Sequence, residues 1–327
     1  MKKSIFLSLL ISIALAGCEQ KNSNGKNEKY LPPSSGTHAE MLIVTQDSLW
    51  RTYIGEALLA TFAREQYGLP QPEGVFSVNR IKPAAFSSLF KKAKSIVFVE
   101  LGDTTMVQVK RDVWARPQIV ATLIAPTPKE LFRLLRENED ALVTTFHEAD
   151  LNVVRHRMKG TAYKTLPKSI QELGIKKMTL SSGFEQTLDK PEIKIFRQAT
   201  KKTQQFMLFY TRPISEEILP GQDIIAARDT VGKKYFEGSH EGSYFGTEML
   251  IPPQQNTTEI DGQFAIETRG MWKTFGDFMG GPFLSYTIYN DQKNEILCIE
   301  GFIYGPDAKK RNIMMEMEAM MRSVKFE

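Results

Sequence analysis

Apolar positions along the chain follow two patterns, short continuous runs typical of strands and a spacing of three to four residues typical of helices. In the first half, runs and helical spacing alternate, which predicts a mixed sheet backed by helices. Strands are expected at 41–44, 75–81, 95–101, 106–109 and 118–125, and helices from residue 47 or 48 to about 62, from 83 to about 90, and at 128–147.

The most specific local signal in this half is the start of the last helix. Thr127 stands at the N-cap position, Pro128 at the first helical position and Glu130 at the third, which together form a capping box. Apolar residues then follow at helical spacing on one stripe. These residues are Leu131, Leu135, Leu142 and Phe146.

Strand patterns dominate the second half, after the periodic signal lapses at 160–166. Because the polar segment 290–294 joins two strands as a hairpin loop, we expect an antiparallel meander. Its final helix carries an apolar stripe that includes Met314, Met317 and Met321 and leaves Met315 outside. Strands are predicted at 176–180, 193–197, 205–210, 244–251, 262–272, 283–289 and 295–304, and helices at 223–234 and 308–322. The fold class is therefore α+β, with subdomains at 39–160 and 161–327.

The N-terminus has the pattern of a lipoprotein signal peptide. Lys2 and Lys3 precede a mainly apolar run, 4–16, that is too short to cross a bilayer as a stable helix. The residues LAGC at 15–18 resemble the lipobox of bacterial lipoproteins, which implies cleavage before Cys18 and a diacylglyceryl group on its thiol. We therefore expect a signal peptide at 1–17 and a lipid anchor at Cys18. The alternative is an ordinary signal peptide that ends at a cysteine by chance.

The segment 18–38 is predicted to be a flexible tether, because it is polar, rich in Asn, Lys, Gly and Ser, and has almost nothing to bury. About twenty such residues have a root-mean-square reach of roughly 20–25 Å. The residues after Cys18 show neither a clear inner-membrane retention signal nor a dense acidic run. We therefore expect an anchor in the outer membrane with the folded part facing the periplasm.

Composition and charge exclude several classes of protein. The chain has 327 residues, of which 42% are hydrophobic and 24% charged, so it folds and is neither collagen-like nor wholly disordered. A mean hydropathy of −0.28 excludes a protein with many membrane spans. Loss of Lys2 and Lys3 with the signal peptide lowers the formal net charge from +4 to +2. A charge this close to zero argues against a dedicated nucleic-acid-binding protein.

Cysteine and histidine give no sign of a metal site or a familiar hydrolase. With Cys18 acylated, Cys298 stands alone and is expected to fill space in a buried strand, and a catalytic thiol is the less favoured alternative. The four histidines lack the spacing of metal ligands. No motif of a serine hydrolase, a P-loop or a dinucleotide-binding site occurs in its expected context. We expect no cofactor, no metal and no assigned catalytic residue.

The loop at 235–246, YFEGSHEGSYFG, is the candidate ligand-binding segment, because aromatic rings lie among flexible polar residues that can donate and accept hydrogen bonds. Two alternatives stay open: a glycine-rich turn that leads into a strand, and a glycosidase that uses Glu237 and Glu241 as its paired carboxylates. The candidate ligand-binding residues are Tyr235, Glu237, His240, Glu241, Tyr244 and Phe245.

Two further features favour structural roles over chemistry. Alternation places Glu267 and Arg269 on one face of a strand, and Glu300 beside Cys298 on another, where charged groups pair across a sheet or line a pocket. The glycines of MGGP at 279–282 are expected to form a tight turn whose bare backbone a ligand can approach.

Several sequence segments resemble a lipoprotein family of Bacteroidota known as domain of unknown function 4837, over nearly all of the mature chain. The resemblance implies an envelope protein with a lipobox, and it implies no activity, substrate or catalytic residue. The segments are VWARPQ at 113–118, RGMW at 269–272, MGGPF at 279–283, GFIYGP at 301–306, KKR at 309–311 and MEA at 317–319.

These observations lead to an expected function. The chain is predicted to be an envelope lipoprotein that binds or scaffolds another envelope component, a protein or a glycan, with its membrane contact through the lipid at Cys18. The alternative is a hydrolase of envelope glycan or peptide with the loop 235–246 in its site. A purely structural lipoprotein is a third reading.

Overall fold

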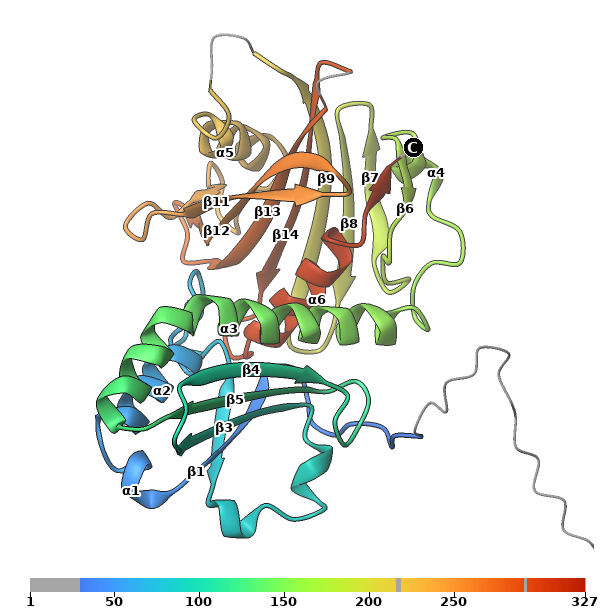
Figure 1. The fold of residues 1–327 in the computed structure, drawn as a ribbon. Helices are drawn as coiled ribbons and strands as arrows, with labels where there is room; N and C mark the ends of the chain where they lie inside the picture. Colours follow the sequence, from blue (N-terminus) through green and yellow to red (C-terminus); the bar gives the residue numbers. More distant parts are fainter. Residues whose placement is uncertain (1–29, 216–218, 291–292, 327) are drawn as a thin grey trace, which may run out of the picture. The chain divides into compact units, whose positions relative to one another are not determined.

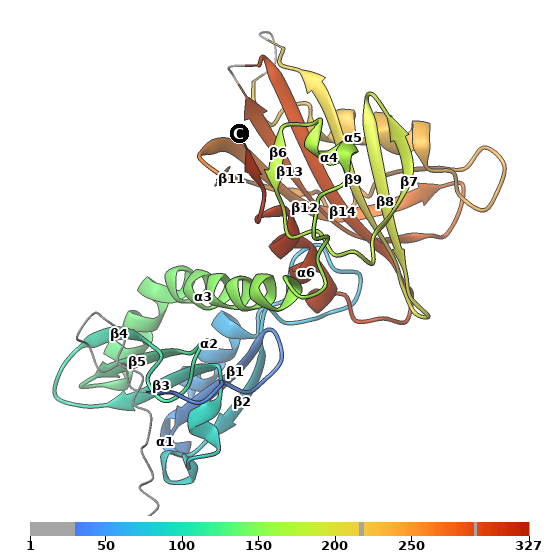
Figure 2. The same ribbon diagram turned by 90° about the vertical axis from the view of Figure 1, so that its right-hand side faces the viewer.

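The structure is a computed structural model that describes residues 30–326 apart from 216–218 and 291–292. Within it, Pro32–Glu327 form one compact unit that holds two large sheets (Figures 1 and 2). The predicted class is confirmed as α+β, with a mixed sheet in the first half, an antiparallel sheet in the second, and a helix near the C-terminus. The predicted signal peptide and Cys18 lie outside the described residues.

The first sheet has five strands in the order β2-β1-β3-β5-β4. Neighbours pair in parallel except for β4, which runs antiparallel to β5 at the edge. The apolar runs form the central strands β1, β3 and β5, which suit a sheet that is covered on both faces. The strands are β1 (Glu40–Thr45), β2 (Ser77–Ile81), β3 (Ser95–Leu101), β4 (Met106–Arg111) and β5 (Ile119–Ala125).

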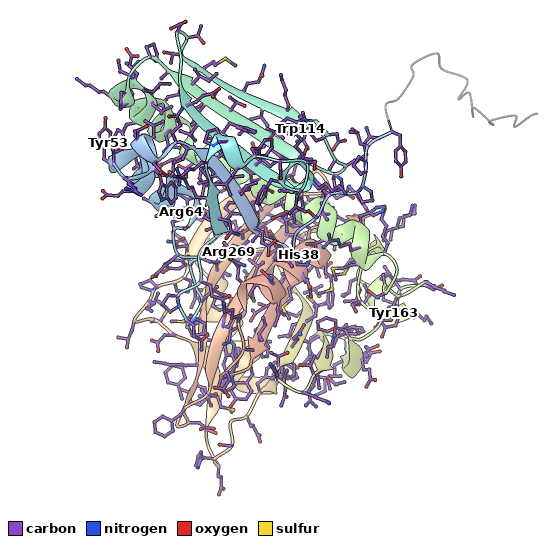
Figure 3. All side chains as sticks on the ribbon, turned by 90° about the horizontal axis from the view of Figure 1, so that it is seen from below. His38, Tyr53, Arg64, Trp114, Tyr163 and Arg269 are labelled. Atoms are coloured by element: carbon purple, nitrogen blue, oxygen red, sulfur yellow. The ribbon has the colours of Figure 1, made fainter. Side chains whose placement is uncertain are left out.

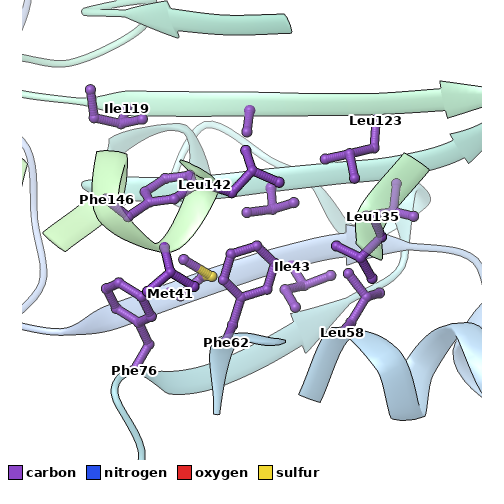
Figure 4. Packing of buried hydrophobic residues seen from close by; sticks show 14 of the residues in the cluster. Met41, Ile43, Leu58, Phe62, Phe76, Ile119, Leu123, Leu135, Leu142 and Phe146 are labelled. Carbon is purple, nitrogen blue, oxygen red and sulfur yellow. The ribbon is translucent and has the colours of Figure 1, made fainter. Parts of the chain in front are cut away.

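Helices α1 (Asp47–Trp50), α2 (Tyr53–Phe62) and α3 (Pro128–Met158) supply the hydrophobic core on one face of this sheet. At its centre the rings of Phe62, Phe76 and Phe146 meet edge to face, with centroids 6.2–6.4 Å apart (Figure 4). The opposite face is covered by Phe86, which follows the short 3₁₀ turn Pro83–Ala85, by Phe90 of a second turn, Phe90–Lys92, and by Trp114.

Two of the predicted helices in this half are wrong in extent. The helix expected from residue 47 or 48 is divided at Thr52, whose hydroxyl donates to the Leu49 carbonyl at 2.7 Å and accepts from the Ile54 N–H at 3.3 Å, so it ends one helix and caps the next. The helix expected after Pro83 is replaced by the 3₁₀ turns. Phe86 leaves helical geometry with ψ of 88°, and its ring packs edge to face on Phe98 at 5.0 Å.

Helix α3 starts where the capping box predicts, since the Glu130 N–H donates to the Thr127 hydroxyl at 3.2 Å. It continues to Met158, eleven residues beyond the predicted end at 147. The extension keeps a buried stripe, because Leu151, Val153 and Val154 are all buried. One long helix therefore crosses from the core of the first half to the elements of the second.

The second sheet has eight antiparallel strands in the order β10-β12-β13-β14-β9-β8-β7, and β11 pairs with the other end of β12. The predicted meander of the last two long strands is confirmed by the pairing of β13 with β14. The polar strands β7 and β11 were not predicted. The strands are β7 (Glu185–Lys190), β8 (Ile193–Ala199), β9 (Gln204–Pro213), β10 (Tyr244–Thr247), β11 (Gln254–Ile260), β12 (Gln263–Phe275), β13 (Gly280–Asn290) and β14 (Glu295–Tyr304).

Both faces of this sheet are covered, so its central strands are apolar on both sides. Helix α5 (Ile224–Tyr235) packs on one face. The other face holds α6 (Arg311–Met321), the short helix α4 (Lys168–Gln171), and the two-stranded pair of β6 (Ile175–Lys177) and β15 (Lys325–Phe326).

Helix α6 belongs to two cores at once, which corrects the expectation for Met315. Met314, Met317, Met320 and Met321 pack in the core of the second half as predicted. Met315 is also buried, 4% exposed, because α6 lies against α3 and turns Met315 and Ala319 into the core of the first half. Figures 1 and 2 both show α6 between α3 and the large sheet.

The glycines of 279–282 do not form the predicted turn. Gly280 and Gly281 begin strand β13, and Gly276, with φ of +82°, supplies the left-handed residue of the turn before it. Gly281 is needed for close approach, because a Cβ atom there would lie 2.1 Å from the carbonyl oxygen of Ile303.

The end of the predicted tether is part of the compact unit. Ser34 N–H donates to the Arg116 carbonyl at 3.1 Å, and Ser35 N–H donates to the Lys92 carbonyl at 2.7 Å. The end of the segment predicted as a tether, 18–38, is therefore hydrogen-bonded to loops of the first sheet. A flexible tether can include only the residues before it.

Candidate functional site

The predicted candidate loop runs from the end of α5 into β10 and forms a narrow turn. Glu237 and Tyr244 pair as an antiparallel bridge, and Gly238 N–H donates to the Ser243 carbonyl at 3.4 Å. Gly242, with φ of +79°, completes the reversal. The glycine-rich turn that was one alternative for this segment is therefore present.

A second turn, 276–279, is held against this first one by a carboxylate. Asp277 accepts from the N–H of Ser239 at 2.7 Å and from its hydroxyl at 2.6 Å, and the N–H of Phe278 reaches its other oxygen at 2.6 Å. These three hydrogen bonds, with a smaller contribution from His240, lower the pKa of Asp277 to about 2 against partial burial. We call the two turns, 237–243 and 276–279, the clipped surface.

Ser239, His240 and Asp277 are the three residue types of a catalytic triad, but hydrogen bonds connect them in a different order. In a triad the carboxylate orients the histidine, and the histidine receives the serine proton. Here the Ser239 hydroxyl donates to Asp277 itself, and the His240 Nδ1 lies 3.1 Å from the hydroxyl and 3.7 Å from the carboxylate. The Ser239 hydroxyl is thus engaged by Asp277, and the cluster is arranged to hold the two turns together.

Of the aromatic residues near this surface, Phe278 is the most accessible. The rings of Tyr244 and Phe275 stack at 5.0 Å with an interplanar angle of 18°. The ammonium groups of Lys233 and Lys273 lie over these two rings, each at 4.8 Å, so that the stack carries cations at its ends. Phe278 is wholly exposed.

The structure separates two predicted residues from the clipped surface. The Tyr235 hydroxyl donates to Glu192 at 2.7 Å, on the turn between β7 and β8. That bond, with Lys234, lowers the pKa of Glu192 to about 2. Phe245 is 5% exposed and packs on Trp272 and Phe302, both at 4.8 Å, so it supports the surface from beneath. Glu237, His240 and Glu241 are exposed on the turn.

The charged residues predicted on strands β12 and β14 form buried ion pairs, as the structural interpretation expects. Arg269, labelled in Figure 3, binds Glu267 and Glu318, both at 2.6 Å, and the hydroxyl of Tyr286 donates to Glu267 at 2.7 Å. On the other face of the sheet Arg228 lies 2.9 Å from Glu300, and its guanidinium stacks 3.7 Å from the ring of Phe283.

The described residues show neither a metal site nor a membrane helix. No cluster of three or more His, Cys, Asp or Glu side chains within them is arranged to hold a metal ion. No helix among the same residues is long and apolar enough to cross a bilayer. Cys298 is 2% exposed, and burial raises the pKa of its thiol, which fits the predicted role of a small buried side chain.

Sequence reasoning missed Phe275, Asp277 and Phe278. They lie about thirty residues beyond the end of the predicted loop, and the pairing of β10 with β12 brings the two segments together. The segment FGDF at 275–278 was itself a usable signal, because a Gly-Asp pair flanked by aromatic residues is typical of a turn with exposed rings.

Replacing Asp277 with alanine is expected to free the two turns from each other. Amide hydrogen exchange in 237–243 should become at least about tenfold faster, because the acceptor that fixes Ser239 is gone. Since the pKa of Asp277 is lowered, the hydrogen bonds of its carboxylate contribute stability at any pH above its ordinary pKa of 3.8. This contribution is lost only as the pH falls through about 2. Glu241→Ala removes an equal charge from the same turn and should leave exchange unchanged. Equal amide exchange rates in 237–243 in the two variants would show that Asp277 does not hold the two turns together.

Comparison with known proteins divides the chain into two matches. Residues 165–323 match the family described as Domain of unknown function (DUF4837), and residues 34–159 match the one described as Domain of unknown function (DUF8532). The DUF4837 match is narrower than the resemblance implied, and the VWARPQ segment at 113–118 falls in the other match. No curated protein matches the chain. The predicted subdomain boundary near 160 lies between the two matches and stays a prediction.

Proposed function

We propose that the chain is a lipid-anchored envelope protein, acylated at Cys18, that binds or scaffolds another envelope protein through the clipped surface. The lipobox at 15–18 and the polar segment that follows it support the anchor. The resemblance to a lipoprotein family of Bacteroidota supports a location in the envelope. The residues after Cys18, which carry neither a clear inner-membrane retention signal nor a dense acidic run, support the outer membrane with the folded part facing the periplasm. The proposal requires no cofactor.

The observation that carries the binding function is the exposure of Phe278. Phe278 is wholly exposed, and it stands on a turn fixed by hydrogen bonds to Asp277. Aromatic side chains on rigid supports are typical anchors at the centre of protein interfaces, and Lys233 and Lys273 would form a charged rim. A protein partner is favoured over a glycan because the stacked rings of Tyr244 and Phe275 already carry lysines over them.

In-cell crosslinking of the tagged protein, followed by affinity capture and mass spectrometry, tests this proposal. One reproducible partner is expected, and Phe278→Ala should reduce its capture by at least about tenfold, as an interface anchor does. Phe264→Ala is the matched control, because Phe264 is also exposed, at 46%, but lies at the opposite end of β12. Cys18→Ala should release the protein from the membrane fraction and reduce capture as well.

The same experiment separates the alternative, a hydrolase of envelope glycan or peptide. Equal capture by Phe278→Ala and the wild type would overturn the docking role of the clipped surface. The double variant Glu237→Ala with Glu241→Ala is the second test. If it is as defective in cells as a strain that lacks the protein, while the protein level and the melting temperature stay unchanged, the function is better explained by a hydrolase.

A further inference from the structure

A cavity of about 570 Å³ lies in the first half of the chain, away from the clipped surface. Its walls come from the loop between β4 and β5, the start of β5, the C-terminal half of α3 and residues 33–34. This volume is within the range of natural small-ligand sites. We call the cavity the basic pocket, and the residues that carry the argument are Arg111, Arg157, His156, Ile119 and Val153.

The backbone around the basic pocket is held by hydrogen bonds. The side-chain amide of Gln118, which is buried, donates to the carbonyls of Lys91 and Ala93 at 2.8 and 2.7 Å, and its oxygen accepts from the Trp114 N–H at 2.9 Å. Arg116 N–H donates to the Pro32 carbonyl at 2.9 Å, which closes the N-terminal side. The loop that follows Arg111 at the end of β4 is therefore fixed before any ligand arrives.

Positive charge on the walls of the basic pocket exceeds negative charge. Lys94, at the back, is balanced by Asp150 at 2.6 Å, and both side chains are buried. Asp112 is the one acidic residue in the lining, and it lies 2.8 Å from Arg116. Arg111, at the end of β4, and Arg157, on α3, have no acidic partner among the residues that the structure describes, and His156 lies beside Arg157 in the sequence. Two guanidinium groups are thus available to a ligand.

Five residues of the lining are apolar. Ile119 and Val153 are buried, and Ala149, Pro33 and Pro117 complete the apolar part of the wall. An inorganic anion would satisfy the arginines and leave this surface in contact with water. A molecule with an anionic head and an apolar body would use both parts of the lining.

We propose that the basic pocket binds a free small organic anion, whose phosphate or carboxylate head pairs with Arg111 and Arg157 and whose apolar body packs on Ile119 and Val153. Guanidinium groups suit both heads, since they offer two parallel N–H donors to planar or tetrahedral oxyanions. This site is independent of the clipped surface, which belongs to the other half of the chain.

Calorimetric titration of the full mature chain with octyl phosphate tests the proposal. Octyl phosphate should bind saturably, inorganic phosphate at least about tenfold more weakly because it lacks the apolar body, and octanol with no measurable affinity. Arg111→Glu with Arg157→Glu should weaken octyl phosphate binding by at least about tenfold. A thermal melt of each variant confirms that it is folded.

Lys110→Glu with Lys159→Glu is the matched control, because both lysines are exposed neighbours outside the lining and the net charge changes equally. These variants should bind octyl phosphate as the wild type does. An equal loss in the control pair, equal affinity for inorganic phosphate, or no saturable binding by the wild type would each overturn the proposal. Binding to phosphatidylglycerol vesicles without binding of free octyl phosphate would overturn the proposal too, since the bound anion would then be a membrane headgroup and not a free small molecule.

Discussion

Replacing Glu318 with glutamine is expected to lower the free energy of unfolding by about 3–5 kcal/mol, the range for breaking a buried ion pair by removing one partner. The Glu318 side chain is 2% exposed. It binds His147 of α3 at 2.9 Å and Arg269 of β12 at 2.6 Å, so it joins the two halves of the chain. Glutamine keeps the shape of the side chain but removes the negative charge that His147 and Arg269 share. Chemical denaturation followed by circular dichroism measures the loss.

The loss of stability in Glu318→Gln should depend on pH in a defined direction. Burial disfavours the charge of both partners, but Arg269 and His147 hold the pKa of Glu318 below 4.5, and Glu318 holds the pKa of His147 above 6.5. The Glu318 carboxylate contributes its full stability at pH values above 4.5, and this contribution is lost as the pH falls through its lowered pKa. The His147 imidazolium contributes its full stability below pH 6.5, and this contribution is lost as the pH rises through its raised pKa. The difference from the wild type should therefore be largest between these two values and shrink toward alkaline pH.

Glu316→Gln serves as the control for Glu318, because Glu316 lies on the same helix, is 44% exposed and lies 3.7 Å from His38. A change below about 0.5 kcal/mol is expected there. In Glu318→Gln the pKa of His147, followed by NMR, should fall, because burial and Arg269 lower it and only the weaker effect of Glu148 still raises it. An unchanged pKa of His147 would contradict the network.

Replacing Phe146 with alanine is expected to destabilise the protein by about 3–5 kcal/mol. Phe146 is fully buried, and its ring centroid lies 6.2 Å from that of Phe62 and 6.3 Å from that of Phe76, so truncation leaves a cavity among three aromatic rings (Figure 4). The surrounding helix and sheet are regular elements that cannot collapse fully into the space. Thermal unfolding by calorimetry measures the change.

Phe132 of the same helix provides the comparison for Phe146. It is 38% exposed and meets the ring of Tyr53 at 5.7 Å. Phe132→Ala removes the same atoms from a half-solvated site, and we expect about 1 kcal/mol or less. Similar losses for the two phenylalanines would show that the core of the first half is not packed as described.

Sequence predicted most of the buried elements because their apolar residues mark them. Strands β1, β3 and β5 and the start of α3 follow from apolar runs and from one capping box. Polar edge strands carry no such mark, and β11, with the sequence QQNTTEI, owes its structure to pairing with β12. Met315 was misplaced because a single stripe was expected on α6, whereas contact with α3 buries a second side of the helix.

The candidate site could be predicted only in part, for a similar reason. The loop 237–243 was visible in the sequence through its glycines and aromatic residues. Its partner, Asp277, acts across 38 residues, and its hydrogen bonds to Ser239 depend on the register of β10 against β12. The buried position of Phe245 likewise follows from the packing of α5 on β10, which local sequence does not reveal.

The place of α6 between two cores has a consequence for the order in which the chain matures. Residues 311–321 are synthesised after the strands and helices of the first half, yet Met315 and Ala319 complete the core that those elements build. Until α6 is made, the first half keeps an apolar opening beside α3. Synthesis of α6 thus acts as a checkpoint, because a chain terminated before this helix exposes apolar surface of the kind that chaperones and proteases recognise.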